Sequence, residues 1–176
     1  DIKTGKIDVN MKAFEDAEKK VKEFISNISS NQSGNPVDYY HKKLGQIMWN
    51  KCGMSRNEQD LKKAIEEIKI LKKDFYKNVY VPGESGGYNE ELAKAGRVAD
   101  FLELGELFAI DALERKESCG GHFREEYQTK EGEALRNDED YTFVSCWEFM
   151  GDGKTPKLNK EQLKFESIEL KSRSYK

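Results

Sequence analysis

The stretch NEELAKAGRVADFLELGELFAIDALERK (residues 89–116) carries the longest apolar pattern of the chain, and it decides the fold class. Its apolar side chains recur at three- and four-residue spacing, which is the period of an α-helix. The polar side chains of its second half form a narrow arc: Asp100, Glu103, Glu106, Asp111 and Glu114. So narrow an arc predicts a helix that is buried on most sides. Other amphipathic elements must then cover it.

Three shorter amphipathic patterns precede this stretch and can provide that cover. They run over about residues 14–28, 37–52 and 61–78, and polar or glycine-containing segments separate them. Asn35 before Pro36 predicts the start of the second helix, and Ser55 and Glu58 have the spacing of a capping box that would start the third. Short connections favour antiparallel neighbours, so the sequence predicts a bundle of about four helices over residues 11–117. Residues 1–10 are expected to be a terminal linker.

The last part of the chain, residues 118–176, has a different pattern. After an irregular, charged segment, apolar and polar residues alternate from Tyr141 to Phe149, which predicts a strand. Gly151 and Gly153 indicate a turn, and residues 163–170 (LKFESIEL) are expected to form the returning strand. Because an isolated two-stranded ribbon is marginal in water, it should lie on or beside the bundle. The fold class predicted is therefore mainly α, an antiparallel helical bundle followed by an irregular segment and a C-terminal β-hairpin.

Composition excludes several classes of function. The chain has 176 residues, with 30 basic and 33 acidic side chains, and a net charge of -3 argues against a general nucleic-acid or anionic-membrane binder. The sequence shows no apolar run of membrane-spanning length and no signal peptide. Three cysteines suit a reducing cytoplasm. Two histidines leave little material for a metal centre, and the glycine motifs that cradle nucleotide phosphates are missing.

The densest group of reactive side chains is the segment ESCGGHFREE (residues 117–126). Cys119 and His122 could form half of a metal site or an activated thiolate. The favoured alternative is a tight turn after the long helix, in which Gly120 and Gly121 adopt backbone angles that other residues avoid. From the residues alone, the charged run at 136–140 is read as a solvated loop.

Several stretches resemble a known family. They are RVADFLELGELFAIDAL (97–113), RKESCGGHFREEY (115–127) and GEALRNDEDYTFVSCWEF (132–149), with HKKLGQIMWNKCGMSRNEQDLKKAI (41–65) upstream. Together they resemble the C-terminal region of the flavoprotein subunit of succinate dehydrogenase and fumarate reductase, which has an E-S-R-G-A-H-x-R segment followed by R-D-D. The ending KSRSYK (171–176) is similar to the longer, Bacteroidetes-type members. The resemblance covers about residues 11–176.

The chain departs from this family pattern at three positions. Cys119 replaces the usual arginine, Gly121 replaces alanine, and Asn137 replaces the first aspartate of R-D-D. A role that the family arginine performs by its charge cannot pass to a thiol. His122 and Arg124 match the pattern, as does Arg136, and they are carried over as motif positions.

The resemblance implies an oxidoreductase of electron transport and the tricarboxylic acid cycle, which interconverts succinate and fumarate using FAD. The family's FAD fingerprint and its catalytic residues lie upstream of the region matched here. The chain is therefore expected to be a C-terminal helical domain with a structural and interface role. It is expected to have no catalytic, cofactor-binding or metal-binding residues, to be inactive alone, and to belong to a subunit that carries FAD.

The resemblance also implies partners. They are the FAD-binding domain of the same polypeptide, the iron–sulfur subunit and, indirectly, a membrane cytochrome b subunit, on the inner face of the cytoplasmic membrane. The candidate interface residues are Glu117, Cys119, His122, Arg124, Arg136 and Asp138. If the segment 117–138 is an interface, it should be exposed in this chain. The competing possibility is that its side chains fold back on the bundle and satisfy one another.

A different class of function fits the same pattern, namely a free-standing helical interaction module that uses the hairpin edge and the charged segment. The upstream reading frame separates the two hypotheses. A continuous frame with a G-x-G-x-x-G fingerprint favours the flavoprotein, and a start codon near Asp1 favours the module.

Overall fold

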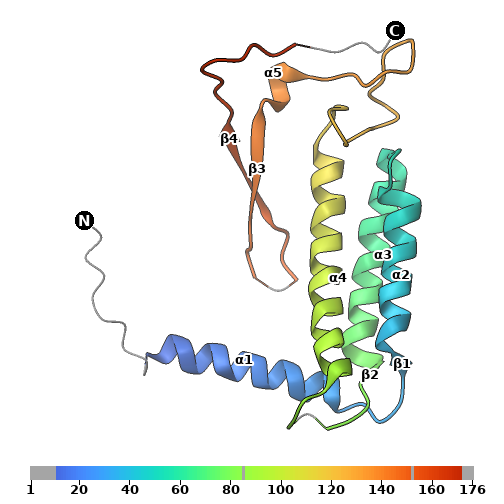
Figure 1. Ribbon diagram of the computed structural model, residues 1–176, viewed down its shortest axis with the longest axis vertical. Coiled ribbons are helices and arrows are strands. Elements are labelled where there is room, and N and C mark those ends of the chain that lie inside the picture. The colour runs from blue at the N-terminus through green and yellow to red at the C-terminus, as the bar shows by residue number, and fades with distance from the viewer. Residues whose placement is uncertain (1–10, 85, 152, 172–176) are drawn as a thin grey trace. The chain divides into compact units, whose positions relative to one another are not determined.

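The computed structural model describes residues 11–84, 86–151 and 153–171 (Figure 1). Residues 1–10, where a linker is expected, lie outside this range, as does most of KSRSYK. The elements, in chain order, are α1 Lys12–Ser29, β1 Asn35–Pro36, α2 Val37–Cys52, α3 Glu58–Asn78, β2 Val79–Tyr80, α4 Glu90–Glu114, α5 Asp138–Tyr141, β3 Phe143–Glu148 and β4 Lys157–Gln162. The predicted fold class, mainly helical with a C-terminal strand pair, is confirmed. Within the described ranges, no helix is both long and apolar enough to cross a membrane.

The chain divides into two compact units, and α2, α3 and α4 each contribute one part to each unit. Aromatic rings form the core of the first unit. Phe75 on α3 is fully buried and meets Tyr40 of α2 and its neighbour Tyr76 edge to face, at ring-centroid distances of 5.2 and 5.4 Å. The Tyr40 hydroxyl donates a hydrogen bond to Asp74 Oδ2 at 2.9 Å, and burial raises the pKa of Tyr40 to about 12. The hydroxyl therefore keeps its proton near neutral pH and can donate to Asp74.

The start of α2 differs from the prediction. Asn35 and Pro36 form β1, which pairs in parallel with Val79 and Tyr80 of β2, and the helix begins at Val37. The backbone of this pair is extended, so Asn35 does not cap the helix. Gly34 precedes it at a φ of +153°, and a Cβ there would lie 2.0 Å from the Asn78 carbonyl oxygen. The close approach of the two chain segments requires glycine at this point.

The helix α1 forms over the predicted stretch, but most of its apolar face is exposed. Ile28 is fully buried, and the Phe24 ring meets Tyr76 edge to face at 6.3 Å. Phe14 and Val21, in contrast, are 49% and 57% exposed. The C-terminal turns of α1 are thus the part that packs on the first unit.

The second unit has an aliphatic core made by the facing ends of three helices. Cys52 is buried at the end of α2, and burial raises the pKa of its thiol. The other buried members come from α3 and α4: Leu61, Ala64, Ile65, Ala109 and Ala112. Small alanine side chains let the helix backbones approach closely.

The prediction that the long helix is buried on most sides is wrong. On α4, Phe101, Leu104 and Phe108 are 42%, 62% and 45% exposed. The buried side chains of this helix are mostly small, and the larger ones that are fully buried are Leu102 and Val98. The other helices therefore cover one face of α4, and the sequence pattern overstated its burial because apolar residues continue onto the uncovered face.

The hairpin is confirmed, but its second strand begins earlier than predicted. Strands β3 and β4 pair antiparallel, from Phe143 opposite Gln162 to Glu148 opposite Lys157. Residues 163–170 contain no strand, so the returning strand was placed too late. Phe143 is buried, and the indole N–H of Trp147 donates to Asp111 Oδ1 of α4 at 2.8 Å. These contacts place the ribbon against α4 within the second unit.

Candidate functional site

The candidate site is the segment 117–138, here called the motif loop, together with the helix ends that it contacts in the second unit. Its first feature is a tight turn in which the backbone of Cys119 and that of His122 exchange two hydrogen bonds, of 2.8 and 3.0 Å. Gly120 has a φ of +58°, a left-handed angle that favours glycine, whereas Gly121 has no positive φ, so the prediction holds for the first glycine only. The peptide N–H of Ser118 donates to the Leu135 carbonyl at 2.9 Å, so the two ends of the loop are tied together.

Arg124 closes the C-terminus of α4. Its side chain is 1% exposed, and Nη1 donates to the carbonyl oxygens of Ala112 at 2.9 Å and Leu113 at 3.2 Å. These carbonyls belong to the last turn of the helix, where no intrahelical donor is available. Nε of Arg124 donates to Glu126 Oε2 at 3.1 Å, which balances the buried charge. The guanidinium thus satisfies a helix end and has a carboxylate partner.

Arg56, in the connection between α2 and α3, has the matching role at the end of α2. Its Nε donates to the carbonyl oxygens of Cys52 and Gly53, at 3.1 and 3.0 Å. Its backbone N–H donates to the Phe123 carbonyl, and its carbonyl accepts the N–H of Glu125 at 2.8 Å. A short parallel bridge therefore joins the motif loop to this connection.

His122 lies between two arginines, and its hydrogen bonds define its tautomer. Arg56 Nη1 is 2.8 Å from Nδ1, and the Arg115 carbonyl oxygen is 3.0 Å from Nε2. Because a guanidinium can only donate, Nδ1 must accept, and Nε2 must carry the proton that the carbonyl accepts. Burial, reinforced by the nearby positive charges, lowers the pKa of His122. The imidazole is therefore neutral near pH 7, and both of its nitrogens are occupied by groups other than the Cys119 thiol.

Glu117 is the second buried charge of the loop. Its side chain is 3% exposed, and Oε1 accepts from Arg115 Nη1 at 2.7 Å while Oε2 accepts the Asn137 N–H at 2.9 Å. Arg115 also donates to the carbonyl oxygens of Tyr141 and Phe143. This pair joins the end of α4 to the start of the hairpin.

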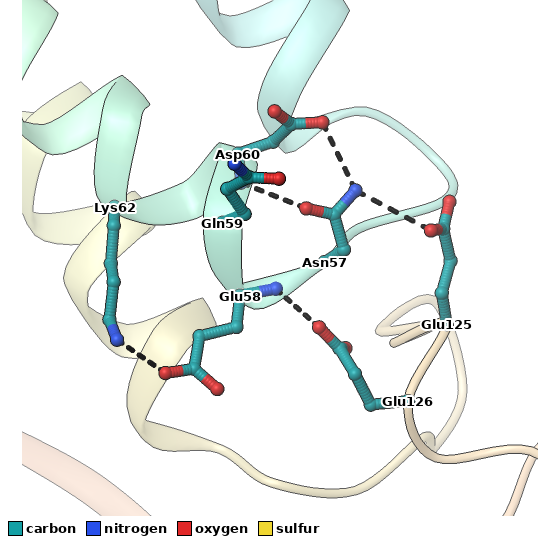
Figure 2. Close-up of a pocket in the computed structure, with 7 residues that line it drawn as sticks. All are labelled: Asn57, Glu58, Gln59, Asp60, Lys62, Glu125 and Glu126. Atoms are coloured by element: carbon teal, nitrogen blue, oxygen red, sulfur yellow. Dashed lines mark hydrogen bonds and ion pairs between the residues drawn. The ribbon is translucent and has the colours of Figure 1, made fainter.

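The N-terminus of α3 is capped by a residue other than the one predicted. Asn57 Oδ1 accepts the Asp60 N–H at 2.8 Å (Figure 2). The Ser55 hydroxyl instead donates to Glu125 Oε1 at 2.8 Å. The capping-box prediction for Ser55 and Glu58 is therefore wrong. The Glu58 carboxylate pairs with Lys62 one turn later, and the Glu58 N–H donates to the carboxylate of Glu126.

The six predicted interface residues fall into two groups. Glu117 and Arg124 are buried, so the expected exposure of the loop is wrong for these two, and His122 is half-buried and hydrogen-bonded internally. Cys119 and Asp138 are exposed. Arg136 pairs with Asp138 at 2.6 Å and donates to the Lys171 carbonyl at 3.0 Å. Glu117, Arg124 and His122 therefore bond within the domain, Cys119 and Asp138 are exposed, and Arg136 is only partly exposed, at 25% of its side chain.

Sequence reasoning missed two residues that complete this network, Arg56 and Arg115. Arg56 lies inside the segment that was read as a capping box, and nothing in its neighbourhood points to a partner 66 residues away. Arg115 follows the last residue of α4, and a basic residue at a helix C-terminus is a signal that could have identified it.

Comparison with known proteins gives consistent matches. The family described as "Fumarate reductase flavoprotein C-term" matches residues 41–175. The fumarate reductase flavoprotein subunit of Haemophilus influenzae is 26% identical over 123 residues, covering 70% of this chain and 20% of that protein. The succinate dehydrogenase flavoprotein subunit of Bacillus subtilis is 21% identical over 168 residues, covering 96% of this chain and 28% of that protein.

Solved structures share the fold. A structure of E. coli quinol fumarate reductase matches with a TM-score of 0.76 at 23% identity, covering 92% of this chain and 27% of that chain. The chain spans between 20% and 28% of the length of the two curated relatives described above. The family match covers well over half of the chain, including the whole motif loop. The chain therefore belongs to the fumarate reductase and succinate dehydrogenase flavoprotein family, and it corresponds to the C-terminal domain.

Proposed function

We propose that this domain supports and helps to assemble a flavoprotein subunit that interconverts succinate and fumarate, and that the chemistry takes place on other parts of the subunit. The observation that carries the proposal is that residues of the family motif form hydrogen bonds inside the domain. Arg124 and His122 match the family pattern, and both form hydrogen bonds within the domain. Arg124 donates to carbonyl oxygens at the end of α4, and His122 bonds the Arg56 side chain and the Arg115 carbonyl. A guanidinium that is 1% exposed supports the fold and cannot bind a substrate carboxylate.

The residues around the α3 N-terminus do not fit FAD. The open pocket there, about 620 Å³ in volume, is lined by Asn57, Glu58, Gln59, Asp60, Lys62, Glu125 and Glu126 (Figure 2). Its carboxylates outnumber its single ammonium group and would repel a diphosphate. Glu126 and Asn57 already accept backbone N–H groups that could otherwise bind a phosphate. The backbone N–H groups at this helix start are therefore already bonded to side chains of the domain.

The proposed cofactor and partners follow from the family. FAD would be bound by the rest of the subunit, and the iron–sulfur subunit would dock nearby, with a membrane cytochrome b contacted indirectly. The complex would lie at the inner face of the cytoplasmic membrane. The exposed part of the motif loop supports an interface there, because Cys119, Leu135 and Asp138 are all accessible. Accessible apolar and charged groups side by side are typical of a surface that a partner covers.

The first test concerns flavin. We expect this chain, purified and mixed with FAD, to retain no flavin absorbance through gel filtration and to reduce no dye with succinate, because its residues offer no cradle for a diphosphate. The full-length subunit, prepared in the same way, serves as the positive control. A flavin band that travels with this chain would contradict the proposal.

The second test concerns the surface pair. Arg136→Ala should change the stability of this chain by at most about 1 kcal/mol, because its partner Asp138 is exposed and the pair is screened by solvent. In the full-length subunit, the same change should reduce co-purification with the iron–sulfur subunit or retention of FAD. Lys130→Ala, at an exposed position of the motif loop, is the matched control. If Arg136→Ala leaves assembly and flavin content equal to those of the control, the interface does not include this residue.

A further inference from the structure

We propose that His122 is a proton-sensitive latch, which holds the turn 119–122 of the motif loop on the connection between α2 and α3 and releases it when Nδ1 is protonated. This inference concerns the chain itself and goes beyond the assembly role proposed above. It stands on the arrangement of groups around the imidazole. Arg56 Nη1 donates to Nδ1 at 2.8 Å, so the bond exists only while that nitrogen carries no proton.

Protonation would convert this contact from an attraction to a repulsion. An N–H on Nδ1 would face the guanidinium N–H at hydrogen-bond distance, with a positive charge on each side. Arg56 has little freedom to withdraw, because its Nε is held by the carbonyl oxygens of Cys52 and Gly53 at 3.1 and 3.0 Å. The imidazole is therefore the partner that must move.

The charges that face His122 from the surrounding elements are positive. They are Arg56 from the connection, Arg115 after α4, and Arg124 of the loop itself. The carboxylates closest in this network are already paired, Glu117 with Arg115 at 2.7 Å and Glu126 with Arg124 at 3.1 Å. The Cys52 thiol beside Arg56 is kept neutral by burial, which raises its pKa. Burial and these cations together lower the pKa of His122, in agreement with a site built for the neutral ring.

Once the bond to Arg56 is lost, the side chain of His122 keeps its hydrogen bond to the Arg115 carbonyl at 3.0 Å, and the turn before it has open space to shift. Gly120 and Gly121 precede it, and a Cβ added at either position would meet no atom within 4 Å. Beside the imidazole, two backbone hydrogen bonds join the loop to Arg56, from the Arg56 N–H to Phe123 and from the Glu125 N–H to Arg56. These are the bonds that should weaken when the imidazole leaves. The exposed Cys119 turn would then detach from the connection at acidic pH.

The chain contains a built-in reference for the experiment, since its other histidine, His41, is exposed on α2. Long-range 1H–15N spectra should show His122 as the Nε2–H tautomer, titrating below the ordinary histidine pKa of about 6.5. Amide exchange of Arg56 and Glu125, measured as protection relative to the intrinsic rate, should fall by about tenfold or more between about pH 7.5 and pH 5. An Nδ1–H tautomer, or a His122 whose pKa is not lowered from the ordinary value, would overturn the latch.

Two variants separate titration from a merely structural loss. In His122→Gln the side-chain oxygen can still accept from Arg56, and the group does not titrate in this range. Its protection should therefore stay within about twofold over the same pH interval, whereas His41→Gln should keep the full wild-type change. If His122→Gln loses protection at acidic pH as the wild type does, another group is responsible and the proposal fails. If the amides of His122→Gln are unprotected at both pH values, the same measurement is made on His122→Asn, whose side-chain oxygen can also accept from Arg56. The tautomer spectrum of the wild type is then the second test, and an Nδ1–H form refutes the proposal.

Discussion

Replacing Arg124 by alanine is expected to lower the free energy of unfolding by about 3 to 5 kcal/mol, the largest effect of any charged residue in the described part of the chain. The change leaves the carbonyl oxygens of Ala112 and Leu113 without their donor, and it leaves Glu126 without its partner. It also opens space where a fully buried side chain stood. Urea unfolding of this chain, followed by far-ultraviolet circular dichroism, measures the loss.

Two further variants define what Arg124 contributes. Arg124→Lys keeps the charge but has no planar fork, so it cannot bond Glu126 and the helix carbonyls together and should recover less than half of the loss. Arg136→Ala, at the exposed pair with Asp138, should cost at most about 1 kcal/mol. Equal losses for Arg124→Ala and Arg136→Ala would show that the burial assigned to Arg124 is wrong.

Arg124 and Arg136 show how much a family resemblance can say about the role of a residue. Both match motif positions, but Arg124 is buried and donates to the carbonyl oxygens at the end of α4, whereas Arg136 is partly exposed and pairs with the exposed Asp138. A motif position therefore identifies a place in the fold and leaves its role open. The surroundings of each side chain decide whether it supports the domain or is available to a partner.

The helices were predictable because burying one face of a helix imposes a period on the sequence. The starts of α1 and α4, and the end of α2 before Gly53, fall within a few residues of the pattern. The residue that caps a helix was less predictable than where the helix lies, since several polar residues compete to be the cap. Ser55 and Asn57 both have suitable side chains, and the choice of Asn57 depends on Glu125, which attracts the Ser55 hydroxyl from another part of the chain.

The second strand of the hairpin was missed for a related reason. Residues 157–162 (KLNKEQ) are mostly exposed, so nothing in the strand requires alternation of apolar and polar residues. Residues 163–170 have more apolar side chains, among them Phe165 and Ile168, but these are 45% and 72% exposed. A pattern of hydrophobicity predicts a strand only where one face of it is buried.

The network around the motif loop could not be predicted from local sequence. The partners of Arg124 are backbone carbonyls at a helix end, which every helix possesses and no side chain marks. The contact between Arg56 and His122 joins residues from two different connections. Such contacts depend on the packing of the helices, and they become visible only when the helix ends have been placed.

Replacing Phe75 by alanine should lower the free energy of unfolding by about 3 to 5 kcal/mol, through lost burial and a residual cavity in the first unit. The ring is 0% exposed and packs edge to face on Tyr40 and Tyr76. Urea unfolding again measures the effect, and near-ultraviolet circular dichroism reports the environment of the neighbouring tyrosines. Ile70→Ala is the control, because this side chain on the same helix is 67% exposed and should change stability by no more than about 0.5 kcal/mol.

A conservative variant shows how the stabilisation by Phe75 divides between volume and ring geometry. Phe75→Leu keeps most of the apolar volume but removes both edge-to-face contacts, which are worth about 0.5 to 1.5 kcal/mol each beyond burial. We expect its loss to lie between those of Ile70→Ala and Phe75→Ala. A loss for Phe75→Leu as large as that for Phe75→Ala would mean that the rings of Tyr40 and Tyr76 hold the core by geometry more than by burial. A loss no larger than that of Ile70→Ala would show that Phe75 is not the centre of this unit, because a core residue whose shape is changed cannot leave its neighbours undisturbed.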